Sequence, residues 1–418
     1  MNSALAAVIG LVLAILLIVR KVSPFYSLML GALTGGLLSG IGLEATVGHM
    51  LAGVKDITPA ILRILAAGVL SGALIKTGAA ASISQAVVKG LGHKHVYLAI
   101  ALSAMLLTGV GVFVDVAVIT VAPIALMLGK SLAISRPKLL LAMIGGAKAG
   151  NVMSPNPNTI IAAENYDAAL PSVMGAGVVP AIVGLLVTVY VILPLIPSPK
   201  AGVCEYDDIN NTDQESCPSF LASISGPLAS IVLLALRPVF GIVIDPMIAL
   251  PVGGLVTLLA TRSLDRTGVS LSFGLEKMSA VAILLVGTGT IAGIIKESEI
   301  KDVLIAMLSG WEAGGVVLAP LSSILMSAAT ASTTAGATIA SASFSQTVLG
   351  AGVSAVWAAS MTNAGATVLD HLPHGSFFHA TGGSVNMSIK ERMKLIPYES
   401  LVGLVLTLTS LGCYLILG

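Results

Sequence analysis

The stretch AKAGNVMSPNPNT, residues 147–159, lies inside an apolar segment that otherwise has the length of a membrane-spanning helix. Within it occur two prolines, three asparagines and a lysine. Proline removes a backbone donor and interrupts a helix, so the helix expected over about 139–163 is predicted to be broken. Irregular backbone at membrane depth is tolerated only where protein or a hydrated cavity covers it, so this break is a candidate binding site.

A second break of the same kind follows half a chain later, in TNAGATVLDHLPHGS, residues 362–376. Ala149-Gly150 of the first stretch aligns with Ala364-Gly365 of the second. Similarly, SGALIKTG (71–78) resembles AGIIKESE (292–299). Both matches are separated by about 215–220 residues, so the chain is predicted to contain an internal repeat.

Composition places both breaks in a membrane protein. The chain has 418 residues, 56% of them hydrophobic and 10% charged, with a mean hydropathy of +0.99. Soluble domains carry about 25% charged residues, so most of this surface must face lipid. An ordinary soluble enzyme and a secreted disulfide scaffold are thereby excluded. The net charge of +1 provides no field for phosphates, so no nucleic-acid partner is expected.

Ten apolar runs have roughly the length of a membrane-spanning helix. They lie at about 3–19, 25–43, 57–75, 139–163, 172–196, 221–236, 245–261, 278–295, 351–371 and 395–417. With Arg20 and Lys21 placed in the cytoplasm, the cytoplasmic loops collect fifteen Lys and Arg residues and the outer loops four. This bias predicts that both termini lie on the outer face.

Two further apolar stretches, 96–129 and 312–350, do not fit as simple spans. In the first, the legs Val96–Leu107 and Val116–Leu128 would each be about 18–20 Å long, shorter than the roughly 30 Å hydrocarbon core. Its ends are both basic and should lie on the same side. We predict a re-entrant hairpin at each stretch, although a helix pair that crosses fully and returns fits the first one as well.

The predicted fold class is therefore an all-α polytopic membrane protein made of two repeats, each with five transmembrane helices and one re-entrant hairpin. Because five is odd, the second repeat would be inverted, as in many secondary transporters. The boundaries are 1–197 (hairpin about 96–129, broken helix about 139–163), a cytoplasmic linker at 198–220, and 221–418 (hairpin about 312–350, broken helix about 351–376).

The polar side chains of the breaks and hairpin tips are the candidate substrate contacts. Those of the first half are Lys148, Asn151, Asn156, Asn158 and Thr159, and those of the second half are Ser332, Thr333, Thr334 and Asn363. Lys148 would pair with a substrate carboxylate, or else be a snorkelling or structurally paired lysine. The substrate would sit between the two hairpin tips and the two breaks.

Charged residues inside a bilayer are costly and usually functional, so Asp115 and Asp370 are the candidate proton-coupling residues. Asp115 could instead cap a helix that begins at Val116. Asp370 stands near His371 and His374, which would either relay protons or be solvated at the cytoplasmic mouth. This spacing is not one of a known metal site, so no metal is predicted.

Two other features are left with two interpretations each. Arg63 would pair with a buried acid or reach the outer surface. Small residues at Gly31, Gly35, Gly36 and Gly40 allow close helix packing or a dimer face.

No hydrolase, kinase or P-loop motif is present, so we expect no enzyme activity and no cofactor, and any pumping would use an ion gradient. The neutral oxygens at the breaks also fit a sodium-coupled carrier, and a cation/proton antiporter is a third possibility.

The chain resembles the gluconate permease family, the gluconate:proton symporters of bacterial inner membranes. The resemblance is carried by VFVDVAVITVAPIALML (112–128), the AG-x4-P-x-P-x-T break (149–159), ATASTTAGATIAS (329–341) and VLDHLPHGSFF (368–378) followed by NMSIKERMKLI (386–396). It implies uptake of a small organic anion with protons, acids at Asp115 and Asp370, and a multi-pass inner-membrane location. The wider ion transporter superfamily implies homodimers, opposed hairpins and elevator-type movement.

The chain also departs from that family. Gluconate carriers have a His-Gly and then a Pro-Pro-His-Pro pattern at the first break, where this chain has Ala149-Gly150 and MSPNPN (153–158). Lys148 replaces a residue that is commonly small and polar. The expected substrate is thus gluconate, another sugar acid or a small hydroxy acid.

Overall fold

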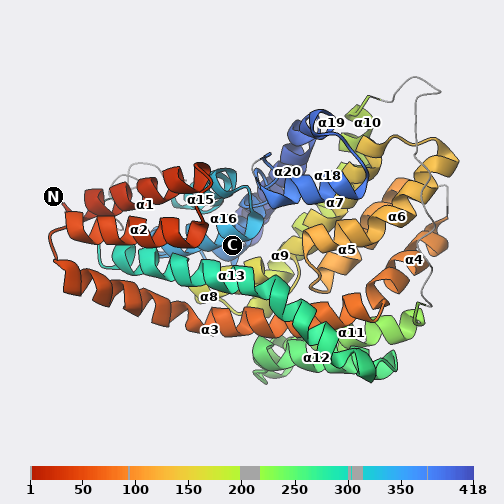
Figure 1. Ribbon diagram of the computed structural model, residues 1–418, viewed down its shortest axis with the longest axis horizontal. Helices are drawn as coiled ribbons and strands as arrows, with labels where there is room; N and C mark the ends of the chain where they lie inside the picture. Colours follow the sequence, from red (N-terminus) through yellow and green to blue (C-terminus); the bar gives the residue numbers. More distant parts are fainter. Residues whose placement is uncertain (1, 93–94, 198–216, 300–302, 304–313, 374) are drawn as a thin grey trace.

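The computed structural model describes residues 2–92, 95–197, 217–299, 303, 314–373 and 375–418. Within these ranges every regular element is a helix, which confirms the predicted all-α class (Figure 1). Most of the predicted linker, residues 198–216, and His374 lie outside the described residues.

The described helices before the linker range from the long α3 to the short α10. They are α1 (Ser3–Val19), α2 (Pro24–Leu38), α3 (Leu43–Lys76), α4 (Ala79–Leu91), α5 (Val96–Gly109), α6 (Val114–Leu132), α7 (Arg136–Val152), α8 (Pro157–Asn165), α9 (Leu170–Val187), the π-helical η2 (Thr188–Ile192) and α10 (Leu193–Leu195).

The described helices after the linker include one long helix, α13, and several shorter ones. They are α11 (Phe220–Phe240), α12 (Pro246–Ala260), the 3₁₀ turn η3 (Leu264–Arg266), α13 (Thr267–Lys296), α15 (Gly314–Thr330), α16 (Thr333–Gly350), α17 (Ala355–Gly365), α18 (Ser376–Ser384), α19 (Ile389–Met393) and α20 (Ile396–Leu417).

Five of the described helices are long and apolar enough to cross a membrane by length and composition. They are Leu43–Lys76, Val114–Leu132, Leu170–Leu195, Leu264–Lys296 and Ile389–Leu417. The predicted spans 57–75 and 278–295 lie within longer helices, α3 with 34 residues and α13 with 30 residues. Both helices extend beyond their apolar stretch through segments that carry charges, which hydropathy alone does not assign to a helix.

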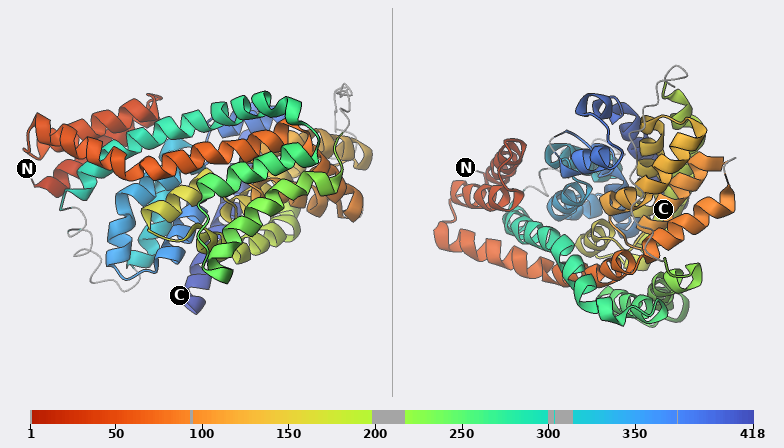
Figure 2. Two further views of the ribbon diagram at one scale, coloured as in Figure 1. Left: turned by 90° about the horizontal axis from the view of Figure 1, so that it is seen from below. Right: turned by 45° about the vertical axis from the view of Figure 1, so that its right-hand side comes forward.

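Helices α3 and α13 lie against each other and run along one layer of the molecule. Helices α1 and α2 lie at one end of this layer, and α11 and α12 lie at the other (Figures 1 and 2). A Cβ atom added to Gly53 would collide with the carbonyl oxygen of Gly289, and one added to Gly72 would collide with that of Ser270. The pairing of early residues of α3 with late residues of α13 means that the two helices are antiparallel.

The glycines of α2 pack against other helices of the same chain. Gly31 and Gly35 are buried against α1, where a Cβ atom on Gly35 would lie 3.2 Å from the carbonyl oxygen of Ala6. Gly36 faces the side chain of Thr46 on α3. Of the two interpretations of this spacing, close packing between helices of one chain is the one that the structure provides for these three residues.

The second layer contains two helix pairs, α5–α6 and α15–α16, each joined by a short turn. Helix α6 begins at Val114 and has 19 residues, about 28 Å, so it is longer than the predicted leg Val116–Leu128. Helix α7 packs on α5, and α17 packs on α15. At these contacts Gly150 faces the carbonyl of Met105, and Gly365 faces that of Pro320. The aligned Ala-Gly motifs thus serve the same packing role in both halves.

Candidate functional site

Both predicted breaks are present. Helix α7 ends at Val152 and α8 starts at Pro157, while α17 ends at Gly365 and α18 starts at Ser376. At the first break, the side chain of Asn156 accepts hydrogen bonds from the backbone N–H groups of Asn158 (2.8 Å) and Thr159 (3.1 Å). Its amide nitrogen donates to Ser154 Oγ (2.7 Å) and to the carbonyl of Asn151. Asn156 therefore holds the break together as the N-cap of α8.

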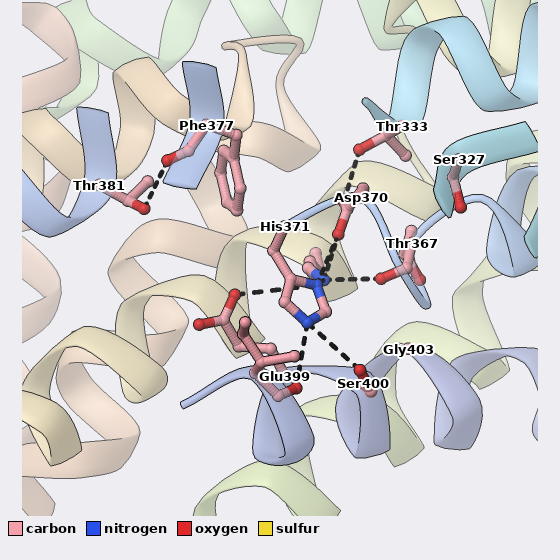
Figure 3. A network of polar contacts seen from close by, with 12 residues as sticks. Ser327, Thr333, Thr367, Asp370, His371, Phe377, Thr381, Glu399, Ser400 and Gly403 are labelled. Carbon is pink, nitrogen blue, oxygen red and sulfur yellow. Dashed lines mark hydrogen bonds and ion pairs between the residues drawn. The ribbon is translucent and has the colours of Figure 1, made fainter. Parts of the chain in front are cut away.

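The second break brings a carboxylate to Lys148 of α7. The Nζ atom of Lys148 donates to the carbonyl of Thr367 (2.6 Å), to Asp370 Oδ1 (2.6 Å) and to His371 Nδ1 (3.1 Å). The other oxygen of Asp370 accepts the hydroxyl of Thr333, the first residue of α16, at 2.6 Å (Figure 3). Lys148 is 1% exposed and Asp370 2% exposed, so this ion pair is shielded from solvent.

His371 connects this pair with α20. Its Nε2 lies 3.1 Å from the carbonyl of Ile396 and 3.3 Å from Ser400 Oγ (Figure 3). A carbonyl only accepts, so Nε2 carries the hydrogen of that bond. Nδ1 lies 3.0 Å from Asp370 Oδ1, beside the Lys148 ammonium. The Nδ1 atom thus faces a donor, the Lys148 ammonium, and an acceptor, the Asp370 carboxylate, at the same time.

A second buried ion pair adjoins the first. Glu399 Oε2 lies 3.9 Å from His371 Nδ1, and Arg392 of α19 binds both oxygens of Glu399, one of them at 3.1 Å. Arg392 also donates to Thr381 Oγ1 (3.2 Å). With a neutral His371, Lys148 and Arg392 balance Asp370 and Glu399, so the buried network has no net charge. A buried charge without a partner is strongly destabilising, which explains this balance.

Neutral side chains from both halves meet beside the Lys148–Asp370 pair. Thr334 Oγ1 donates to Asn158 Oδ1 (2.6 Å), which joins the start of α16 to the start of α8. Asn363 Nδ2 donates to Thr159 Oγ1 (3.0 Å) and to the carbonyl of Val152 (3.5 Å), which joins α17 to the first break. The predicted polar residues of the two breaks and of the second hairpin tip therefore form one connected group.

Two atoms of this group have no hydrogen-bond partner. They are the amide nitrogen of Asn151, a residue 3% exposed, and the amide oxygen of Asn363, a residue that is fully buried. A buried polar group without a partner costs about 1–3 kcal/mol. One is a donor and the other an acceptor, so a ligand with both functions would satisfy them.

Two predicted residues have more local roles. Ser332 caps α16 by accepting the N–H of Ala335 at 3.3 Å. Asp115 is half-buried and accepts the N–H of Val116 at 2.9 Å. Because α6 starts at Val114 after the cap residue Phe113, the expectation that Asp115 caps a helix beginning at Val116 is wrong, although its carboxylate does bond within the first turn. The hydrogen bonds of the described residues do not link it to Lys148 or Asp370.

Arg63 pairs with acids, as one of the two interpretations predicts, but these acids are half-buried and not buried. Its Nη2 lies 2.8 Å from Asp245 Oδ2, and it also binds Glu164 at the end of α8. Arg63 and Asp245 line a surface pocket of about 360 Å³ together with Lys55 and Leu62. Asp245 also accepts the N–H of Met247 at 2.8 Å.

Sequence reasoning missed Glu399, Arg392 and Thr381 as members of the site. Glu399 is an acid inside the predicted last span, and a charge at such a position is itself a signal of function. The predicted topology places Arg392 in a cytoplasmic loop, yet its side chain is 1% exposed. Tyr166, whose hydroxyl lies 2.8 Å from Thr362 Oγ1, gave no such signal because buried tyrosines are common.

Comparisons with known proteins agree with this architecture. The family model described as GntP family permease matches residues 3–417. An uncharacterized transporter of Haemophilus influenzae is 53% identical over 408 residues, covering 98% of this chain and 97% of its own. A high-affinity gluconate transporter of Escherichia coli is 24% identical over 439 residues, with 96% of each chain covered. The YdaH transporter of Alcanivorax borkumensis has a similar fold, with a TM-score of 0.65, 14% identity and 90% and 88% of the two chains covered.

Proposed function

The chain belongs to the GntP family of permeases, and from this premise we propose that it imports a small hydroxycarboxylate, gluconate or a related sugar acid, together with protons. Like its relatives, it is an integral membrane transporter and not an enzyme. The observation that carries the substrate class is the pair of unpartnered atoms, Asn151 Nδ2 and Asn363 Oδ1. A carboxylate would accept from the first, and a hydroxyl would donate to the second.

The surroundings of these atoms support an anionic substrate. Helices α8 and α16 begin in the same polar group, and the N-terminus of a helix carries unpaired N–H groups and a partial positive charge. The contacts Thr334–Asn158 and Asn363–Thr159 hold these two ends together. Asn158, Thr159, Thr333 and Thr334 would then orient the hydroxyls of the substrate.

Coupling to protons would be located at Asp370, which lies in the buried network beside this group. Asp115, at the first turn of α6, is the second candidate because it is an acid near the first hairpin tip. A sodium-coupled carboxylate carrier is the alternative, since the free oxygen of Asn363 and the hydroxyls of Thr159 and Thr333 are the neutral ligands that Na⁺ accepts.

For the movement we propose an elevator mechanism in a homodimer of inverted repeats. Two observations support the repeat. Helices α3 and α13 pair in antiparallel fashion, and Gly150 and Gly365 make the same kind of packing contact in the two halves. In this arrangement the layer that contains α3 and α13 would stay fixed. The hairpins α5–α6 and α15–α16 and the two broken helices would carry the substrate across. The bacterial inner membrane, with both termini outside, is the proposed location.

Uptake into proteoliposomes tests this function. Labelled gluconate, glycerate and citrate would each be offered under an imposed pH gradient and, separately, under an imposed sodium gradient. Accumulation of a hydroxy acid under the pH gradient alone is the expected result. Accumulation only with sodium would instead establish the sodium-coupled carrier, and no uptake of any of the three acids would overturn the substrate class.

A further inference from the structure

We propose that Lys148 alternates between two carboxylates. It is held by Asp370 in the arrangement described above, and it pairs with the carboxylate of the substrate once the Asp370–His371 pair has taken up a proton. This inference rests on the proposed function and assigns its coupling step to one lysine. Proton uptake would then be the event that releases the substrate-binding cation.

The ammonium of Lys148 has no free hydrogen in the present structure. Its three N–H donors match three acceptors, the Thr367 carbonyl (2.6 Å), Asp370 Oδ1 (2.6 Å) and His371 Nδ1 (3.1 Å). A substrate carboxylate can therefore bind Lys148 only by displacing one of them. Asp370 is the only charged group of the three when His371 is neutral, and so it is the partner that competes with another anion.

Lys148 is placed to receive that anion. Lys148 and Asn151 are three residues apart on α7, so their side chains leave the same face of the helix. The unpartnered Nδ2 of Asn151 would bind one carboxylate oxygen while the Lys148 ammonium binds the other. Asn363, whose side chain reaches the carbonyl of the adjacent Val152, offers its free oxygen next to them. A hydroxyl close to a carboxylate, as in a 2- or 3-hydroxy acid, would satisfy all three groups.

The exchange keeps the buried site neutral. While Lys148 is paired with Asp370, the two charges cancel each other. When one proton and one monoanion enter together, the proton neutralises Asp370 and the monoanion neutralises Lys148. A carboxylate bound without a proton would leave an extra negative charge in the membrane interior, which is costly. One proton per monocarboxylate follows from this balance.

His371 shares the coupling proton. Its Nε2 is held by the carbonyl of Ile396, and its Nδ1 lies between the Lys148 ammonium and Asp370 Oδ1. When Lys148 turns away, Nδ1 and the carboxylate face each other at about 3.0 Å, a distance at which they share one proton. The coupling group is thus the Asp370–His371 pair and not either residue alone.

Other titratable and charged side chains on the helices around this pair are already engaged or lie away from it. Glu399 and Arg392 bind each other, and His379 of α18 bonds to the carbonyl of Pro373 at 2.8 Å. Helix α9 carries no acid or base, and α5 carries only the half-buried Tyr97. On α6, Asp115 bonds within its own first turn and Lys130 is exposed at the other end.

The test compares Asp370→Asn with the wild type in proteoliposomes loaded with gluconate or glycerate. In the wild type, affinity for the acid should fall as the pH rises, by up to about tenfold per pH unit, because binding requires one proton. In Asp370→Asn, Lys148 loses the carboxylate but keeps the Thr367 carbonyl and His371 as neutral acceptors, and the bound acid supplies the counter-charge. We expect exchange of labelled for unlabelled acid to persist with affinity independent of pH, while accumulation driven by a pH gradient is lost.

Lys148→Met removes the cation but leaves Asp370 buried and unpaired, and this variant could fail to fold. The double variant Lys148→Met/Asp370→Asn removes both charges together and is expected to fold, yet to lose exchange of the acid. Lys296→Met is the matched control. Lys296 pairs with Asp56 at 2.8 Å in the same way, but the two side chains are 61% and 58% exposed, and uptake should be unchanged.

If the wild type and Asp370→Asn both accumulate the acid under a pH gradient, the alternation of Lys148 between two carboxylates is overturned. The proposed function would remain intact. Full exchange activity in the double variant would have the same meaning. Uptake that responds to an imposed potassium diffusion potential would contradict one proton per monoanion. A wild type that transports none of the acids would overturn both the function and this inference.

Discussion

At the scale of single residues, the site separates side chains that hold the breaks from side chains that are free for a ligand. Asn156 uses its oxygen and its nitrogen on the turn between α7 and α8. Asn151 and Asn363 each keep one amide atom without a partner although both are buried. The same residue type, within one short sequence, therefore has two different roles.

Asn156→Ala should destabilise the protein. Loss of an N-cap costs about 0.5–2 kcal/mol, and the side chain also supports Ser154 and the Asn151 carbonyl. A lower melting temperature in detergent would show this, with Asn156→Ser, which keeps an uncharged capping oxygen, as the control. At a temperature where both variants are folded, an unchanged affinity for the transported acid is expected. A large loss of affinity without loss of stability would instead assign Asn156 to the substrate.

Asn151→Leu should have the opposite profile. The variant removes a buried nitrogen that has no partner in the protein, so the melting temperature should stay the same or rise. A hydrogen bond to a charged ligand contributes about 1.5–3 kcal/mol, so the affinity for the transported acid should fall by at least about tenfold. Competition binding measures the affinity. An unchanged affinity would remove Asn151 from the proposed contacts.

At the scale of elements, glycine positions decide how closely the helices approach. Gly150 on α7 faces the carbonyl of Met105 on α5, and Gly365 on α17 faces that of Pro320 on α15. These contacts set the position of each broken helix against its hairpin. Alanine would force the pairs apart and displace Lys148 and Asn151, which flank Gly150 on the same helix.

Gly150→Ala should therefore destabilise the protein by about 1–3 kcal/mol, the usual cost of an overpacked contact. Gly48→Ala on α3 is the matched control, because nothing lies within 4 Å of the added Cβ atom. Alanine is a better helix former than glycine, so this control should be neutral or slightly stabilising. Thermal unfolding in detergent distinguishes them. Equal melting temperatures for the two variants would contradict the close contact between α7 and α5.

Another element-scale connection is the short helix α8, whose first residues lie in the polar group and whose last residues include Glu164. Through Arg63, Glu164 is tied to α3 and to Asp245 at the start of α12. These side chains are 25–35% exposed, so the ion pairs contribute little stability. Their structural consequence is a link between the layer of α3 and α12 and the helix that starts at the site.

At the scale of the whole molecule, two layers are joined around buried polar residues in a chain whose outside is apolar. Exposed aliphatic side chains such as Leu16 (57%), Leu51 (64%) and Val191 (54%) are what lipid contact requires. The buried ions are paired in contrast: Lys148 with Asp370, and Arg392 with Glu399. This distribution suits a protein that moves a polar solute through a membrane.

The proposed orientation can be measured with single cysteines in a background without Cys204, Cys217 and Cys413. A cysteine at the exposed position of Asn2 should react with a membrane-impermeant maleimide added to whole cells, because the N-terminus is predicted to lie outside. A cysteine at the exposed Lys130 should react only after the cells are opened. The reverse pattern would contradict the proposed orientation and place the N-terminus in the cytoplasm.

Much of this protein could be predicted without coordinates, because a membrane imposes simple rules on a sequence. Hydropathy determined the all-helical class, and the prolines of residues 147–159 determined where α7 and α8 separate. The repeated Ala-Gly motif indicated that a second break would follow in the other half, and it does, between α17 and α18. These are local consequences of residue type and spacing.

What only the tertiary structure decided is which polar groups are partners. Asp370 and His371 reach Lys148 from a distant part of the chain, Glu399 lies against His371, and no local rule selects such partners. The full lengths of α3 and α13 are likewise decided by packing, since a contact between helices stabilises turns that hydropathy would leave out. Pairing and helix length depend on neighbours that are remote in sequence, whereas the helical class and its breaks depend on the solvent and on proline.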